Sequence, residues 1–170
     1  MGKRSTFDRV PRDFYPTPRE AVGPLLPHLA PGTQYVEPCA GDGALVRHLA
    51  LAGHICRSAS DIEPRDPSVH EGCYSQIYPA VTVITNPPWT RPILHGIIGR
   101  YAPWVPTWLL FDADWPHTRQ AAPFLPMLRK IVSVGRVKWI PDSKMTGKDN
   151  CCWYLFDAKA TGPAQFVGRA

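Results

Sequence analysis

The chain has 170 residues, of which 44% are hydrophobic, so it fits one globular domain with a sizeable core and leaves little room for a second. Its formal net charge of +5 favours a polyanionic partner. No apolar run approaches the length of a membrane span and no signal peptide precedes the domain, so we expect a cytoplasmic protein with no membrane partner. The five cysteines and six histidines lack metal-ligand spacing, so we predict buried reduced thiols and no metal site.

Predicted helices and strands alternate along the chain. In order, we expect a helix over 18–29, a strand over 34–37, a helix from 44 to 51, strands over 55–60 and 81–85, a helix over 93–101, a strand over 108–111, a helix over 117–127, and strands over 131–140 and 151–156. No strand is predicted in 63–75. This alternation predicts an α/β fold, a mostly parallel twisted sheet with helices on both faces, and the last two strands could pair antiparallel.

The domain boundaries follow from composition. Residues 1–13 are predicted to form a flexible basic arm, residues 14–160 one domain, and residues 161–170 a C-terminal tail. In an open parallel sheet, ligands sit outside the carboxyl ends of the strands, so the loops after the strands are the candidate site.

The first such loop follows the strand at 34–37 and contains two glycines. Gly41 and Gly43 allow a sharp turn and close approach of the backbone to a ligand, although an ordinary strand-to-helix turn has the same composition. Acidic residues favour a ligand: Glu37 and Asp42 could hold an amino group or hydroxyls, and Asp61 stands about 20 residues past Gly41, the offset of a ribose-binding acid. Without the full G-x-G-x-x-G pattern, the loop suits a nucleoside better than a dinucleotide.

The second loop is Asn86-Pro87-Pro88-Trp89, directly after the β-branched strand at 81–85. The prolines end the strand, which places Asn86 at its carboxyl end. Amide and carbonyl acceptors beside an aromatic ring suit a planar amine. Alone, Asn86 would be a turn former and Trp89 a core residue; together, and downstream of the glycine loop, they favour catalysis on an amino group.

The pairing of the two loops resembles class I S-adenosylmethionine-dependent methyltransferases, and more narrowly the amino-methyltransferases with an Asp/Asn-Pro-Pro-aromatic motif. The segments 135–139, 147–150 and 153–156 are similar to small phage-type (Dam-like) DNA N6-adenine methyltransferases. The resemblance implies the Rossmann-like class I fold and S-adenosyl-L-methionine as cofactor. It implies that the cofactor is bound by Tyr15, Thr17, Glu37, Pro38, Cys39, Ala40, Gly41, Asp42, Gly43, Asp61, Ile62 and Asn86.

The resemblance also implies how the reaction proceeds. Asn86 Oδ1 and the Pro87 carbonyl would accept the N–H bonds of the target amine and free its lone pair, while Trp89 would stack on a flipped base. No separate target-recognition domain fits in the chain, so loops must contact the nucleic acid. The candidates for this contact are Arg136, Lys138, Lys144, Lys148 and Asn150. The acid that often contacts the cofactor adenine is missing, because that region reads Gly72-Cys73-Tyr74.

Three functions remain open at this point. The first is methylation of the N6 amino group of adenine in DNA, in a bacterial host or a phage-infected cell. The second keeps the chemistry but changes the substrate, to adenine in RNA or to a protein glutamine; the basic charge argues against glutamine. The third is a non-catalytic nucleic-acid-binding module, against which the intact motif at 86–89 argues. Asp112 and Asp114, which follow the strand at 108–111, are expected to cap the next helix.

Overall fold

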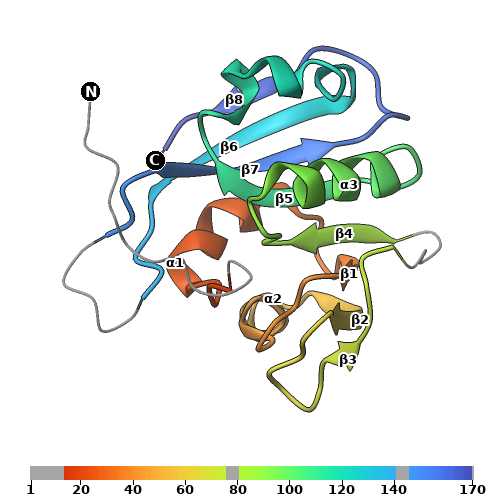
Figure 1. Ribbon diagram of the computed structural model, residues 1–170, viewed down its shortest axis with the longest axis vertical. Helices are drawn as coiled ribbons and strands as arrows, with labels where there is room; N and C mark the ends of the chain where they lie inside the picture. Colours follow the sequence, from red (N-terminus) through yellow and green to blue (C-terminus); the bar gives the residue numbers. More distant parts are fainter. Residues whose placement is uncertain (1–13, 76–80, 141–145, 170) are drawn as a thin grey trace.

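The computed structural model describes residues 14–75, 81–140 and 146–169, and these build one eight-stranded sheet (Figure 1). Across the sheet the strand order is β3-β2-β1-β4-β5-β7-β6-β8. The strands are β1 (Gln34–Glu37), β2 (Ile55–Asp61), β3 (His70–Glu71), β4 (Thr82–Thr85), β5 (Thr107–Asp112), β6 (Leu128–Arg136), β7 (Asn150–Phe156) and β8 (Gln165–Val167).

All strands but one run in the same direction. β1 pairs in parallel with β2 and β4, β2 with β3, β4 with β5, and β6 with β8. β7 lies antiparallel between β5 and β6. The carboxyl ends of β1, β2, β4, β5 and β6 therefore meet at one edge of the sheet, where β7 begins. The predicted mostly parallel sheet with an antiparallel C-terminal strand is confirmed.

Two hydrophobic cores cover the two faces of the sheet, because successive side chains of a buried strand point to opposite faces. In β4, Val83 belongs to the core built with α3 (Arg91–Tyr101), and Ile84 belongs to the core built with α1 (Arg19–Val22) and α2 (Ala44–Leu51). β5 alternates in the same way from Trp108 to Phe111. The prediction of helices on both faces is thereby confirmed (Figure 1).

Proline shortens two predicted helices. The helix expected over 18–29 is α for four residues and then becomes the 3-10 helix η2 (Gly23–His28), which contains Pro24 and Pro27. The helix expected over 117–127 is wrong. Three short 3-10 helices stand there, η3 (Trp115–His117), η4 (Arg119–Ala121) and η5 (Leu125–Met127). The prolines of this segment lack the N–H that would continue an α-helix.

The structure also contains two strands that the sequence did not predict. β3 is a two-residue strand within 63–75, and β8 lies in the segment assigned to the tail, where it pairs with β6 from Lys130↔Gln165 to Val132↔Val167. The strand predicted over 131–140 instead spans 128–136. Within the described residues the longest helix has 11 residues, and none has the length and hydropathy to cross a bilayer.

Candidate active site

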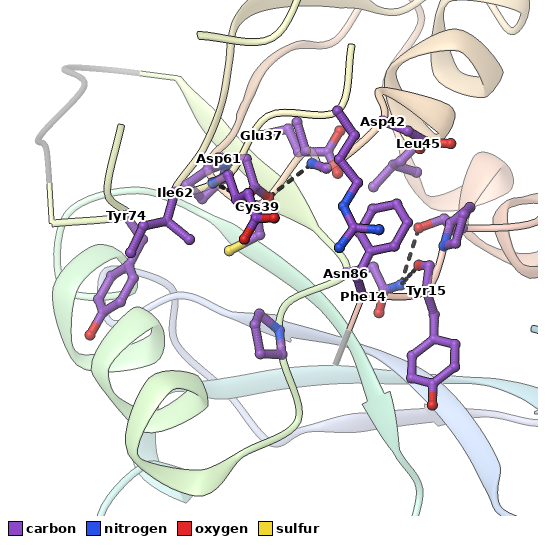
Figure 2. A pocket seen from close by; sticks show the side chains of 18 of the residues that line it. Phe14, Tyr15, Glu37, Cys39, Asp42, Leu45, Asp61, Ile62, Tyr74 and Asn86 are labelled. Carbon is purple, nitrogen blue, oxygen red and sulfur yellow. Dashed lines mark hydrogen bonds between the residues drawn. The ribbon is translucent and has the colours of Figure 1, made fainter. Parts of the chain in front are cut away.

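A cavity of about 700 Å³ opens at the carboxyl ends of β1, β2 and β4 (Figure 2). Its walls come from the N-terminal segment 14–17, the loop after β1, the end of β2, residues 73–74 and the loop from β4 into α3. Every residue predicted to bind a cofactor lines this cavity except Gly43. Segments distant in the sequence thus meet at the edge where a ligand was expected.

Asn86 is held in one orientation at the end of β4. Its Nδ2 donates hydrogen bonds to the Tyr15 carbonyl over 3.4 Å and to Thr17 Oγ1 over 3.2 Å (Figure 2). A backbone carbonyl can only accept, so the NH₂ side of the amide must face the N-terminal segment. This leaves Oδ1 as an acceptor for a group inside the cavity.

The glycine loop is packed tightly against the N-terminal segment. Gly41 has φ +55°, and a Cβ built there would lie 2.6 Å from Cε2 of Phe14, so the ring rests on the glycine itself. The guanidinium of Arg65 stacks over the Phe14 ring at 3.7 Å from its centroid. Asp61 ties the end of β2 to the same loop, because its Oδ2 accepts from the Gly41 N–H over 2.9 Å. Its Oδ1 accepts from the Glu63 N–H over 2.9 Å.

Glu37, at the end of β1, has a buried carboxyl group, and one of its oxygens lacks a hydrogen-bond partner among the described residues. Its exposed fraction is 2%, and among the described residues its Oε2 has no hydrogen-bond partner. Burial raises the pKa of Glu37 well above its ordinary value, and the charges of Asp42 and Asp61 raise it further. A carboxyl group in this position is suited to receive a donor or a cation from a ligand, since a buried polar atom is costly without a partner.

Asp42 and Gly43 shape the start of α2. Asp42 Oδ1 accepts from the Ala44 N–H over 3.0 Å, and Asp42 Oδ2 lies 3.6 Å from Nη2 of Arg47. Asp42 still lines the cavity, whereas Gly43 occupies the N-cap of α2 with φ +73° and lies outside the cavity wall. Gly43 therefore turns the chain into the helix.

Within the Asn86-Pro87-Pro88-Trp89 motif, Asn86 and Pro88 line the cavity, whereas Pro87, which is buried, and Trp89 do not. Trp89 is half-buried and contacts both cores. Its indole N–H donates to the Leu110 carbonyl over 3.1 Å, and its ring meets Trp139 edge-on with centroids 5.7 Å apart. Trp89 is thus fixed to β5, which the sequence did not reveal.

The cavity wall also includes residues that sequence reasoning missed. Tyr74 and Cys73 line it in the region where the usual adenine-contacting acid is missing. The Tyr101 hydroxyl donates to the Tyr74 carbonyl. A Cβ on Gly96 of α3 would lie 2.7 Å from the Tyr74 hydroxyl oxygen. The pattern of an aromatic side chain seated on a helical glycine could not be recognised from residues so far apart in the chain.

Asp112 and Asp114 do not cap the next helix as expected. Asp112 Oδ2 instead accepts from Nη1 of Arg91 over 2.9 Å, which links the end of β5 to the start of α3. Asp114 stands at the N-cap of η3 but makes no capping hydrogen bond with its side chain. The prediction failed because the following segment is a 3-10 turn with proline at its start, which offers few free N–H groups.

The predicted nucleic-acid contacts lie at the same edge of the sheet as the cavity. Arg136 ends β6 and pairs with Asn150, which begins β7, and both are exposed. Lys148 precedes β7 and is exposed, and the Lys138 backbone N–H donates to Glu20 Oε1 over 2.9 Å. Lys144 lies outside the described residues.

The cysteines and the other metal-binding residue types form no centre of their own. All five cysteines are free thiols, but of the thiols that the sequence predicts to be buried only Cys151 and Cys152 are, and Cys73 is exposed. Burial raises the pKa of the Cys39 thiol, and Asp61 and Glu37 raise it further, so this residue of the cavity wall stays protonated. Among the residues that the structure describes, no cluster of three or more His, Cys, Asp or Glu side chains could hold a metal ion.

No protein-family model matches the chain, and no curated protein matches its sequence. Solved structures do match. A dimethyladenosine transferase from Plasmodium falciparum is 11% identical with a TM-score of 0.55, over 85% of this chain and 62% of that one. A candidate class I S-adenosylmethionine-dependent methyltransferase from Listeria monocytogenes is 10% identical with a TM-score of 0.56, over 88% and 61%.

A candidate RNA methyltransferase from Pyrococcus horikoshii is 19% identical with a TM-score of 0.56, over 91% of this chain and 92% of that one. This chain spans about three fifths of the length of the Plasmodium and Listeria proteins. Together with the strand order, these likenesses show the fold: the chain has the Rossmann-like fold of class I methyltransferases.

Proposed function

We propose that this protein methylates the exocyclic N6 amino group of adenine in DNA, with S-adenosyl-L-methionine as the methyl donor. The observation that carries the proposal is the orientation of Asn86. Both donors on its amide nitrogen are directed to Tyr15 and Thr17, so Oδ1 is the free acceptor at the end of β4. An amine that donates to Oδ1 would be held at the carboxyl edge of the sheet.

The cavity residues fit the proposed cofactor. Glu37 offers a buried carboxyl oxygen that has no partner among the described residues, which suits the ammonium group of a methionine moiety. Asp61 stands at the end of β2, where an acid meets a ribose diol, and Ile62 follows it as an apolar contact for adenine. The volume of about 700 Å³ lies within the range of nucleotide-sized ligand pockets.

The cofactor supplies an electrophilic methyl group on a sulfonium, and the chain's own residues prepare the nucleophile. An aromatic amine is a weak nucleophile because its lone pair is delocalised into the ring. Asn86 Oδ1, with the Pro87 carbonyl as the second proposed acceptor, would draw the amine toward tetrahedral geometry and free the lone pair. The same oxygens would stabilise the positive charge that develops on nitrogen, an effect that is largest in a water-poor site.

Trp89 keeps its proposed role as a stacking surface for the flipped base. Its indole N–H is bound to the Leu110 carbonyl and its ring packs edge-on with Trp139, so the half-buried ring is held rigid. A rigid aromatic surface loses little entropy when a base stacks on it, and such stacking is tolerant of sequence. Arg136, Lys138 and Lys148 would contact phosphates around it.

The decisive experiment is transfer of a tritiated methyl group to unmodified DNA, followed by nuclease digestion and mass spectrometry of the nucleosides. We expect N6-methyladenine with the wild-type protein and a loss of about 100-fold or more in the rate with Asn86→Ala. Gln34→Ala is the matched control, because Gln34 is an exposed amide at the opposite edge of the sheet. Transfer that survives Asn86→Ala would refute the assigned mechanism.

RNA is the second candidate substrate, and the structural neighbours favour it. The Plasmodium protein is a dimethyladenosine transferase and the Pyrococcus protein a candidate RNA methyltransferase. The same assay run with RNA of identical sequence separates the two candidates. Label that appears in RNA alone would keep the chemistry and replace the substrate.

A further inference from the structure

A second cavity of about 480 Å³ lies on the α3 face of the sheet, beyond β5. Its floor is formed by β6 and β7. One wall comes from η3, and the other comes from β8 and Arg169. The floor is part of the same face as the α3 core, because Tyr154 of β7 lines the cavity and belongs to that core. None of its lining residues was assigned a role above except Asn150.

The second cavity is joined to the first by two contacts. Thr90 lines the first cavity, and the next residue, Arg91, forms the ion pair of 2.9 Å with Asp112. The backbone carbonyl of Asp112 accepts from the Tyr154 hydroxyl over 3.0 Å, and Tyr154 lines the second cavity. The two cavities are therefore connected through Arg91, Asp112 and Tyr154 at the carboxyl edge of the sheet.

Phe166 is an exposed apolar side chain in the lining of this cavity. It is 69% exposed on the edge strand β8, opposite Ile131 of β6, and its ring forms a wall of the cavity. A large apolar ring left in solvent beside a hollow is a stacking surface without an occupant.

Arg169 lines this cavity together with Phe166, whereas Arg136 ends β6, a strand of the cavity floor, without lining the cavity itself. Nη1 of Arg169 lies 3.0 Å from the position that a Cβ on Gly135 would occupy, so the guanidinium packs over the backbone of β6. Arg136 follows Gly135 and is exposed. Within the described part of the chain, neither arginine forms an ion pair with an acid. This combination of an aromatic face with unpaired guanidinium groups matches the base and the phosphate of a nucleotide.

The charges are distributed unevenly across the cavity. Asp112 ends β5 and Asp114 follows it at the N-cap of η3, so the acidic groups lie on the β5 side. Asp112 is already paired with Arg91. Arg169, two residues past β8, packs against Gly135 of β6 on the opposite side, and Arg136 follows Gly135. A phosphate would therefore bind near Arg136 and Arg169, with its base between Phe166 and the floor.

We propose that this second cavity binds an unpaired nucleotide that flanks the target adenine, with Phe166 stacking on the base and Arg136 and Arg169 contacting the adjacent phosphates. The inference rests on the proposed nucleic-acid substrate and extends it. It would give the substrate strand a second point of contact, beyond the first cavity. Asn150 and His117, which line the cavity, offer hydrogen bonds to the edge of the base.

Binding of fluorescein-labelled single-stranded DNA and RNA of the same sequence, followed by anisotropy, tests the inference. We expect Phe166→Ala to weaken binding about tenfold and Arg169→Ala to lower the salt dependence by about one phosphate contact. Trp104→Ala and Arg57→Ala are the controls, because Trp104 is 65% exposed in the loop before β5 and Arg57 is exposed on β2. A loss of affinity of Phe166→Ala for either the DNA or the RNA supports the inference. Equal affinities of Phe166→Ala and Trp104→Ala overturn it.

A substrate-length series distinguishes this inference from the proposed function. In the methyl-transfer assay, added flanking nucleotides should lower KM about tenfold for the wild-type protein, and this gain should disappear in the Phe166→Ala, Arg169→Ala double variant. If the double variant transfers methyl groups and its KM still falls when flanking nucleotides are added, the inference about the second cavity is overturned and the proposed function stands. Absence of methyl transfer to any nucleic acid would overturn the proposed function, while the anisotropy measurement would still report on the cavity.

Discussion

The side-chain amide of Asn86 donates a hydrogen bond to Oγ1 of Thr17 over 3.2 Å, although Thr17 lies 69 residues earlier in the chain. Thr17 is 5% exposed, so this contact is shielded from water. Together with the Tyr15 carbonyl, the hydroxyl determines which end of the amide faces the cavity. The N-terminal segment therefore orients the proposed catalytic acceptor as well as lining the cofactor cavity.

We predict that Thr17→Val lowers kcat for methyl transfer by roughly tenfold, since losing one buried hydrogen bond costs on the order of 1 to 1.5 kcal/mol. KM for the cofactor should change little, because the valine keeps the shape of the wall. Thr17→Ser restores the hydroxyl and should restore kcat. Steady-state kinetics of the three proteins check the prediction, and an unchanged kcat in Thr17→Val would show that Asn86 does not need this acceptor.

We predict that the buried Glu37 carboxyl group makes the free energy of unfolding depend on pH. Its pKa in the folded protein lies well above the value of 4.5 for an unperturbed group, mainly because of burial. Between these two values the folded state binds more protons than the unfolded state, so the stability of the cofactor-free protein should fall as pH rises through that interval. Denaturation curves from about pH 5 to about pH 8 should show this fall in the wild type and a flatter profile in Glu37→Gln.

The same substitution tests the ligand role of Glu37. Glu37→Gln removes the carboxylate that would meet the cofactor ammonium group, so affinity for S-adenosyl-L-methionine should drop at least tenfold, by roughly 1.5 kcal/mol or more. Titration calorimetry measures this directly. A variant that is more stable at neutral pH yet binds the cofactor as tightly as the wild type would exclude the proposed contact.

Gly41→Ala should damage both stability and cofactor binding. The left-handed backbone at φ +55° costs a side chain roughly 1 to 2 kcal/mol, and the new methyl group would displace the Phe14 ring from the cavity wall. Gly53→Ala is the matched control, because its φ is +84° but no atom lies within 4 Å of the new Cβ. We expect both variants to lose stability and only Gly41→Ala to lose cofactor affinity. Equal affinities would mean that Phe14 is dispensable.

Trp89 combines a structural and a proposed substrate role, which two substitutions separate. Trp89→Phe removes the hydrogen bond to the Leu110 carbonyl and should lower the free energy of unfolding by about 1 kcal/mol while preserving methyl transfer. Trp89→Leu also removes the ring, so KM for the nucleic acid should rise about tenfold. If the leucine variant keeps the wild-type KM, the ring serves the two cores alone.

The sequence predicted which residues line the first cavity because those residues follow one another closely in the chain. A strand, a glycine loop and the start of a helix follow one another within about ten residues. Pro87 and Pro88 lack a backbone N–H, so the strand ends just before them, at Asn86. Strand alternation likewise predicted the parallel sheet, since buried β-branched runs separated by helical segments leave few other arrangements. The departures were at proline-rich positions such as 116–126, where short-range periodicity resembles a helix that the backbone cannot form.

What the sequence by itself determined is therefore the class of the fold and the identity of the residues at the edge of the first cavity, because each follows from neighbours in the chain. Only the tertiary structure decided how those residues face one another. The orientation of the Asn86 amide by Thr17, the unpaired oxygen of Glu37 and the seat of Phe14 on Gly41 all depend on contacts between distant segments. The pairing of β8 with β6, which builds the second cavity, depends on the register of two strands more than 25 residues apart, and no local pattern encodes that register.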